Sequence, residues 1–188
     1  MANRPKDQAS RESWALAALQ ALSEGGVPAV AVEPIARSLG VTKGSFYWHF
    51  ENREALLAAA VELWEARGTT AIIAELEAID APADRLRALF RRVSDVSKGA
   101  PSHAALSSAS EPAVRKALKR VAAARLEFLT TCYADLGFSP ALARRRALLA
   151  YAAYLGIMQL VRDSPGELGT AAERAAYTDH VIETLVPR

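Results

Sequence analysis

Apolar residues recur three or four positions apart along most of the chain, which is the spacing of one face of an α-helix. Alanine and leucine dominate over β-branched residues, and no stretch alternates convincingly in the way of a half-buried strand. We therefore predict an all-α protein of about nine helices. Outside residues 31–50, which hold two short helices, the predicted helices cover 11–22, 53–79, 83–98, 102–110, 113–136, 140–162 and 171–185.

Glycine, proline and small polar residues separate these helices. Gly25–Gly26 is expected to end the first helix, and Ser139 and Pro140 to cap and begin the helix over 140–162. Gly68 marks a break within 53–79. These signals set the helix boundaries more sharply than the apolar spacing alone.

Residues 31–50 are the most informative stretch. Ile35 and Leu39 lie on one side of a short helix, and Gly40 follows where a left-handed cap favours glycine. Thr42 is expected to cap the next helix with its hydroxyl, while Phe46 and Phe50 face inward. Two short helices joined through a glycine turn predict a helix-turn-helix, whose second helix enters the major groove of DNA.

The run from Ile35 to Leu56, with Leu39-Gly40-Val41-Thr42 at its corner and Phe46-Tyr47-x-His49-Phe50 after it, resembles the signature of the TetR family of bacterial transcriptional regulators. The resemblance covers roughly residues 11–57; beyond it, only length and helical character are similar. It implies a helix-turn-helix DNA-binding domain over 1–52 and a helical effector-binding and dimerisation domain over 53–188. It also implies double-stranded operator DNA, a second copy of the chain and an unidentified small molecule as partners.

The positions that match the family's DNA contacts lie on and just after the second short helix. They are Thr42, Lys43, Gly44, Ser45, Tyr47, Trp48, His49 and Arg53. Lys43 is suited to donate to guanine, and the hydroxyl and imidazole groups to bind phosphates. The alternative is that the aromatic residues only pack between helices.

Two departures from the family pattern weaken the preceding helix as a DNA contact. Ala31 replaces the usual capping threonine, and Glu33 is acidic where the family often carries a polar or basic residue. Residues 1–53 carry six basic and five acidic side chains, so phosphate attraction is weak for one copy. We expect two copies to be needed.

The resemblance implies a ligand cavity enclosed by the later helices. Its candidate residues, each of which would otherwise be plain core, are Trp64, Phe90, His103, Phe128, Cys132, Tyr151, Tyr154 and Met158. The last two long helices are predicted to form the dimer interface, as in the family, or else an ordinary intrachain bundle. The candidate interface residues are Leu148, Ala152, Leu155, Gly156, Gln159, Val181, Ile182 and Leu185.

Composition indicates an ordinary globular protein of 188 residues with a net charge of +2. The polar N-terminus predicts no signal peptide, and the longest uncharged run, 147–161, is too short to span a bilayer. One cysteine and three scattered histidines predict no disulfide and no metal site. We expect a cytoplasmic bacterial protein without a cofactor.

Two other classes of protein stay open. A helical small-molecule carrier with a degenerate DNA-binding motif would explain Ala31, Glu33 and the low charge. A small helical enzyme is the other alternative, although the sequence shows no paired catalytic groups, and we predict that the protein is not an enzyme. Basic clusters at 115–120 and 144–146 are read as solvated faces, with an acidic partner or ligand as the alternative.

Overall fold

The computed structural model describes residues 9–95, 106, 110–164 and 166–187. Every regular element within these residues is a helix, which confirms the all-α fold. The chain divides into two compact units, one made of residues 1–66 and 99–118 and the other of residues 67–98 and 119–188. None of the described helices combines the length and the apolar character needed to cross a membrane.

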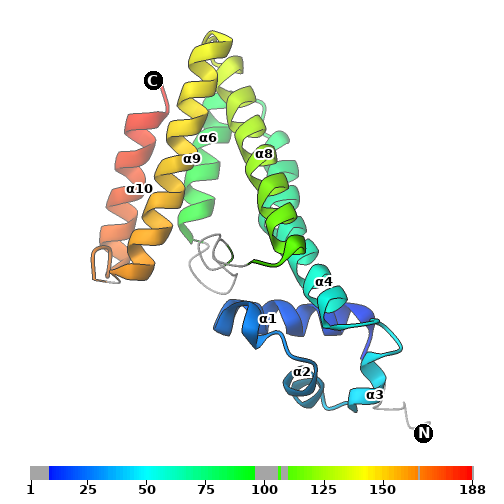
Figure 1. Ribbon diagram of the computed structural model, residues 1–188. Coiled ribbons are helices and arrows are strands. Elements are labelled where there is room, and N and C mark those ends of the chain that lie inside the picture. Colours follow the sequence, from blue (N-terminus) through cyan, green and yellow to red (C-terminus); the bar gives the residue numbers. More distant parts are fainter. Residues whose placement is uncertain (1–8, 96–105, 107–109, 165, 188) are drawn as a thin grey trace, which may run out of the picture. The chain divides into compact units, whose positions relative to one another are not determined.

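The first unit contains the N-terminal helices (Figure 1). They are α1 (Arg11–Ala29), α2 (Val32–Leu39), α3 (Lys43–Phe46) and α4 (Arg53–Glu65). Ser10 caps α1 by accepting a hydrogen bond from the Ser13 amide, and Asn52 caps α4 through the Ala55 amide. Side-chain caps of this kind satisfy amides that the first turn of a helix leaves unpaired.

The core of the first unit is aromatic at the corner where the short helices meet α1. Trp14 and Phe46 are almost fully buried, and their rings meet edge-on with centroids 5.4 Å apart. Phe50 stacks on Phe46 at 5.7 Å, and the Arg11 guanidinium lies over the Phe50 ring at 5.0 Å. The predicted inward direction of Phe46 and Phe50 is confirmed. This packing fixes the backbone from which α3 projects.

The second unit is built on a π-helical turn and five α-helices within the described residues. Its elements are the π-helical turn η1 (Ala66–Thr70, shared with the end of the first unit), α5 (Ala71–Glu77), α6 (Pro82–Asp95), α8 (Pro112–Asp135, which enters this unit at residue 119), α9 (Pro140–Asp163) and α10 (Ala171–Leu185). Pro140 begins α9 as predicted, and Gly137, at φ 86°, ends the turn after α8. The bounds of α10 agree with the sequence prediction.

The core of the second unit lies between α6, α8, α9 and α10. Leu86, Cys132, Tyr133 and Ala147 are fully buried there. The Tyr133 hydroxyl donates a hydrogen bond to the Leu185 carbonyl over 3.1 Å, which anchors the end of α10. Thr170 and Glu173 form a reciprocal capping box at the start of α10. The T-x-x-E spacing of Thr170 and Glu173 is the sequence signature of a capping box, although we did not predict this cap.

Several sequence expectations differ from the structure. The first helix continues beyond Leu22 and is interrupted at Gly26, whose φ of 68° is a left-handed conformation that favours glycine. Thr42 has an extended N-cap backbone, but its hydroxyl makes no capping hydrogen bond. The helix expected over 102–110 lies outside the described residues, apart from the helical Leu106 and residue 110.

The first compact unit also reaches beyond residue 52, the boundary expected for the DNA-binding domain. It includes α4, because Leu56, Leu57 and Ala60 of α4 are buried and α4 packs on α1. The division by function over 1–52 and 53–188 stays a prediction. What the structure adds is that α4 folds as part of the N-terminal unit.

Candidate nucleic-acid interface

The helix-turn-helix corner has the predicted backbone. Gly40 ends α2 at φ 69°, and the Val41 amide donates to the Ala36 carbonyl over 3.0 Å. This single left-handed residue turns the chain so that α3 begins three residues later. A side chain with a Cβ is strained at such a φ, so the sharp corner depends on glycine.

Tyr47 and Trp48 follow α3 in a turn and are 59% and 77% exposed, the two most exposed aromatic side chains recorded among the described residues. The buried Phe46 lies directly beside them, and its ring meets the Tyr47 ring edge-on at 5.1 Å. His49 is half-buried, and Thr42, Lys43 and Gly44 are exposed. The structure therefore does not bury Tyr47 and Trp48 as packing residues. A rigid aromatic core holds them at a surface.

Gly44 faces open space within its own domain. A Cβ built there would meet the Thr42 hydroxyl oxygen at 3.7 Å, an ordinary contact distance. Nothing in the folded chain therefore requires glycine at this helical position, where glycine costs stability. An approach of something outside the chain, such as a DNA backbone, is the simplest reason for its presence.

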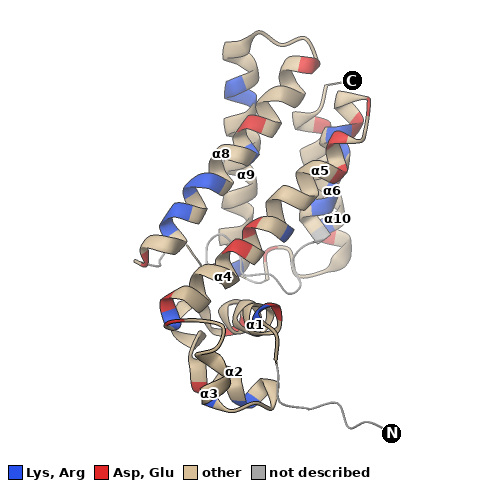
Figure 2. Cartoon of the chain, turned by 90° about the vertical axis from the view of Figure 1, so that its right-hand side faces the viewer, with Lys and Arg blue, Asp and Glu red and all other residues tan. Residues whose placement is uncertain are grey.

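Lys43 and Glu33 form an ion pair across the two short helices. The Lys43 Nζ and the Glu33 Oε1 lie 2.8 Å apart, with both side chains more than half exposed. The hydrogen bond from Lys43 lowers the pKa of Glu33, and the same contact raises the pKa of Lys43. Exposed pairs of this kind are weak in water, so Lys43 can exchange Glu33 for a nucleic-acid acceptor at little cost. Figure 2 colours the charged residues along the ribbon, and both signs of charge occur on α2 and α3.

Arg53 has a structural role that the sequence did not reveal. Its Nε donates to the Val30 carbonyl and its Nη2 to the Val27 carbonyl, each over 2.6 Å. The guanidinium thus ties the start of α4 to the last turn of α1 and to Val30, which follows it. Two of its donors are used inside the domain, so the expected phosphate contact is secondary to this brace.

Replacing Arg53 with lysine is expected to lower the free energy of unfolding by about 1–2 kcal/mol, because one ammonium cannot bridge both carbonyls. Thermal unfolding followed by circular dichroism measures this. Arg37→Lys is the matched control, since Arg37 is exposed at the end of α2. Equal melting temperatures for the two variants would show that the brace contributes nothing.

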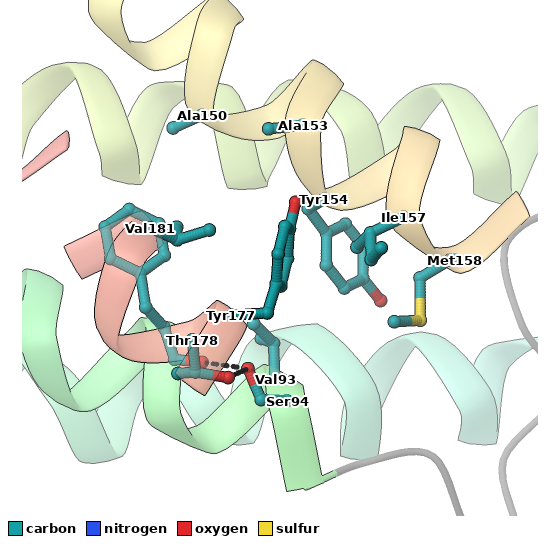
Figure 3. Close-up of a pocket in the computed structure, with 11 residues that line it drawn as sticks. Val93, Ser94, Ala150, Ala153, Tyr154, Ile157, Met158, Tyr177, Thr178 and Val181 are labelled. Atoms are coloured by element: carbon teal, nitrogen blue, oxygen red, sulfur yellow. Dashed lines mark hydrogen bonds between the residues drawn. The ribbon is translucent and has the colours of Figure 1, made fainter. Parts of the chain in front are cut away.

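The candidate ligand residues separate into three groups. Phe90, Tyr154 and Met158 line a cavity between α6, α9 and α10, together with Tyr177 and Thr178 (Figure 3). Phe128, Cys132 and Tyr151 lie in the adjoining core, while Trp64 is buried in the first unit. His103 lies outside the described residues. Of the candidates in the described part of the second unit, the structure thus brings three to one cavity.

The cavity is small and mostly apolar. Its volume is about 40 Å³. An engineered cavity of about 150 Å³ is known to accept benzene, so a ligand larger than a few atoms must displace side chains here. At one end the Thr178 hydroxyl lies 2.8 Å from the Ser94 hydroxyl. Tyr177 and Thr178 were missed by the sequence analysis, because the spacing of α10 did not show which side faces α9.

Cys132 is a core thiol. It is fully buried, and burial raises its pKa to about 11. The thiolate, which is the reactive form, is therefore disfavoured at neutral pH. Among the described residues, no group of three or more His, Cys, Asp and Glu side chains could hold a metal ion.

The residues predicted to form the dimer interface differ in their exposure to solvent. Leu148, Ala152, Gly156 and Gln159 are exposed on α9, and Leu155 and Val181 are partly buried. Ile182 and Leu185 are instead buried in the core of their own chain, so they offer little surface to a second chain, and their place in a dimer interface stays a prediction. Spacing alone could not distinguish the two faces of α10.

The exposed side of α9 is unusually apolar. Leu142, Leu148, Leu149 and Leu160 are between 40% and 59% exposed. Small residues lie among them, including Ala152 and Gly156, which would let another helix approach closely. Contiguous apolar surface of this kind marks an interaction site.

Residues 16–60 match the family profile described as "Bacterial regulatory proteins, tetR family". The chain is 35% identical over 79 residues to the HTH-type transcriptional regulator AcrR of Shigella flexneri, covering 41% of this chain and 34% of that protein. It is 42% identical over 55 residues to the class D tetracycline repressor protein of Escherichia coli, covering 29% of this chain and 25% of the repressor. The chain thus matches only about a third or less of these relatives' lengths.

Solved structures extend the likeness over nearly the whole fold. The reduced form of E. coli NemR superposes with a TM-score of 0.75 at 21% identity, covering 94% of this chain and 97% of NemR. A TetR transcriptional regulator from Chloroflexus aurantiacus gives a TM-score of 0.76 at 23% identity, covering 95% and 94%. At these identities the likeness is one of fold.

Proposed function

Since the chain belongs to the TetR family of bacterial regulatory proteins, we propose that it is a ligand-responsive transcriptional regulator. In this proposal a homodimer binds a palindromic operator in the cytoplasm and represses transcription until a small molecule releases it. The observation that carries the proposal is the exposed surface of Lys43, Tyr47 and Trp48, held over the buried Phe46. Large aromatic side chains held exposed in this way are suited to an interaction surface.

DNA recognition is proposed to rest on α3 and the turn after it. Lys43, at the first position of α3, reaches base edges, while the Tyr47 hydroxyl and His49 bind phosphates. Gly44 lets the backbone approach the groove. Thr42, Ser45, Trp48 and Arg53 complete the proposed contact set, with Arg53 acting chiefly by bracing the domain.

Two copies are proposed to associate through the exposed leucines of α9. A two-fold dimer places two α3 helices in successive major grooves, about 34 Å apart. Such pairing compensates for the weak charge of a single N-terminal domain, whose residues 1–53 have nearly balanced charges. The α9 surface is the part of the described chain that supports this proposal.

The effector is proposed to enter the cavity lined by Phe90, Tyr154 and Met158. The chain runs without interruption from α4 through η1 into α5, so a ligand that rearranges the second unit can act on α4 through the chain itself. A coupling free energy of about 1–3 kcal/mol is typical of such regulation.

The proposal is tested by recovering bound fragments from the genome of the source bacterium and mapping the protected bases. A two-fold symmetric site is expected, with protection in two successive major grooves. Fragments without any shared sequence would contradict the proposal and favour the second candidate, a helical small-molecule-binding protein with a degenerate DNA-binding motif. The ion pair that engages Lys43 with Glu33 is the observation behind that candidate.

Lys43 and Tyr47 are expected to make different kinds of contact. Lys43→Ala should weaken operator binding by about 1–3 kcal/mol and relax base preference, because it removes a donor to base edges. Tyr47→Phe should weaken binding to specific and random DNA alike, since only a phosphate contact is lost. Anisotropy titrations on operator and scrambled duplexes measure both. Equal losses on the two duplexes for Lys43→Ala would remove Lys43 from base readout.

A further inference from the structure

Arg125 of α8 is a half-buried cation that the described chain leaves incompletely paired. Its Nε donates to the Thr69 hydroxyl over 3.1 Å, and its Nη2 donates to the Gly68 carbonyl over 3.0 Å. Its Nη1 is buried and has no hydrogen-bond acceptor among the described residues, and no recorded ion pair includes it. A half-buried guanidinium with neutral acceptors and one nitrogen without a partner is suited to receive an anion.

Two tyrosines adjoin this guanidinium. The Arg125 Cζ lies 5.5 Å from the centroid of the Tyr154 ring, which stacks on Tyr151 with centroids 6.3 Å apart. Burial raises the pKa of Tyr151, and the positive charge of Arg125 opposes that effect. The Tyr151 phenol, whose pKa is raised, is therefore a neutral donor at physiological pH. A carboxylate placed here would meet a planar fork and hydroxyl groups, the partners that it binds best.

Tyr154 also joins this cation to the apolar cavity. The same side chain that lies under the Arg125 guanidinium lines the cavity, where Figure 3 shows its ring with Ile157 and Met158 on α9. The cavity volume of about 40 Å³ is too small for an aromatic ring or a long chain as it stands. Because Tyr154 lies beside both the cavity and Arg125, a movement of its ring would change the space between them. The ligand implied has an apolar body and one negative group.

The acceptors of Arg125 lie in η1, which is a π-helical turn. Such turns are rare and frequently occur at functional sites. Thr69 is buried, and both Gly68 and Thr69 lie in the second unit, a few residues after α4 ends. An anion that binds Nη1 would draw the guanidinium toward itself and away from the Gly68 carbonyl and the Thr69 hydroxyl. It would thereby loosen the turn through which the chain passes from α4 to α5.

We propose that Arg125 is the anchor for the carboxylate of a small organic acid, with the acid's apolar body in the cavity beside Tyr154, and that the bonds of Arg125 to Gly68 and Thr69 transmit binding to η1. This inference rests on the proposed effector-responsive regulator and names its effector class. It assigns ligand binding to Arg125, which lies beside the cavity residue Tyr154 and was not among the candidates predicted from the sequence.

The test compares acids with their neutral amides on the unmodified full-length protein. Benzoate with benzamide and hexanoate with hexanamide are titrated by calorimetry and by thermal shift at millimolar concentrations. At least one acid is expected to bind and to raise the melting temperature, with its amide about tenfold or more weaker. Equal binding of acid and amide, or no binding by any of the four, would overturn the proposal.

Variants assign the preference to Arg125. Arg125→Met should abolish the difference between acid and amide, and Arg125→Lys should retain part of it, since the charge stays but the fork is lost. Arg115→Met, at an exposed arginine of the same helix, is the control and should bind as the unmodified protein does. A full preference for the acid in Arg125→Met would place the anion elsewhere. Should Arg125→Met not fold, Arg125→Lys and the acid–amide comparison decide.

Operator binding separates this inference from the proposed function. The acid that binds is expected to change operator affinity by about fivefold or more in the unmodified protein but not in Arg125→Met. Binding of the acid without any DNA binding would refute the regulator and leave the anion site standing. Operator binding that is indifferent to all four compounds, together with no heat of binding, would refute the anion site alone. If Arg125 only stabilises the fold, Arg125→Met lowers the melting temperature, and the unmodified protein binds acids no better than their amides.

Discussion

Replacing Leu149 with glutamate is expected to convert the protein to a monomer and to weaken operator binding by about a hundredfold or more. Leu149 is 59% exposed on α9, so the charge costs the folded monomer little. Across a two-fold interface the substitution acts twice and buries two unpaired carboxylates. Losing the second half-site removes the gain from bivalent binding, typically a factor of about 10²–10⁴. Sedimentation velocity and anisotropy titration measure the two effects.

Ala123→Glu supplies the matched control for this substitution. Ala123 is exposed on α8, so the same charge is added away from the α9 leucines. It should remain a dimer with unchanged operator affinity. If Leu149→Glu stays dimeric, the exposed leucines of α9 are not the interface, and the proposed arrangement of two α3 helices loses its basis.

The second large effect is expected from Phe46→Ala, which should destabilise the N-terminal unit by about 3–5 kcal/mol and abolish DNA binding. Phe46 is 1% exposed and contacts the rings of Trp14, Tyr47 and Phe50. Its removal leaves a cavity beneath the helix that presents Lys43. Urea unfolding followed by tryptophan fluorescence reports the change, because Trp14 lies against the missing ring.

Trp48→Ala is the control for the aromatic cluster. Trp48 is 77% exposed, so the substitution should leave the free energy of unfolding within about 0.5 kcal/mol while weakening DNA binding. A stability loss for Trp48→Ala comparable to that for Phe46→Ala would mean that Trp48 is a packing residue after all. An unchanged stability for Phe46→Ala would contradict the rigid platform beneath α3.

Local signals were sufficient where one residue decides the backbone. Gly40 predicted the left-handed end of α2, and Pro140 the start of α9. The apolar spacing of Phe46 and Phe50 predicted which side of residues 43–50 faces the core. These features depend on residues close in sequence, so the helix-turn-helix and its exposed surface could be predicted without coordinates.

Contacts between distant residues could not be predicted in this way. Arg53 reaches carbonyls 23 and 26 positions away, and Arg125 reaches η1 across 56 and 57 positions. The spacing of apolar residues predicts that a helical arginine is exposed to solvent. It does not indicate which hydrogen-bond acceptors the arginine contacts. It likewise could not show that Ile182 turns toward its own core. The lining of the cavity and the brace made by Arg53 therefore came from the structure.

We propose that two copies of the α3 surface bind one symmetric DNA site. The most direct test is an anisotropy titration of the DNA site recovered from the genome. The intact palindrome, a half-site and a scrambled duplex are titrated at several salt concentrations. We predict a dimer on the palindrome, weak binding to the half-site, and affinity that falls steeply with salt. Equal and weak binding to all three duplexes would contradict this proposal. It would favour the alternative, a small-molecule-binding protein with a degenerate DNA-binding motif.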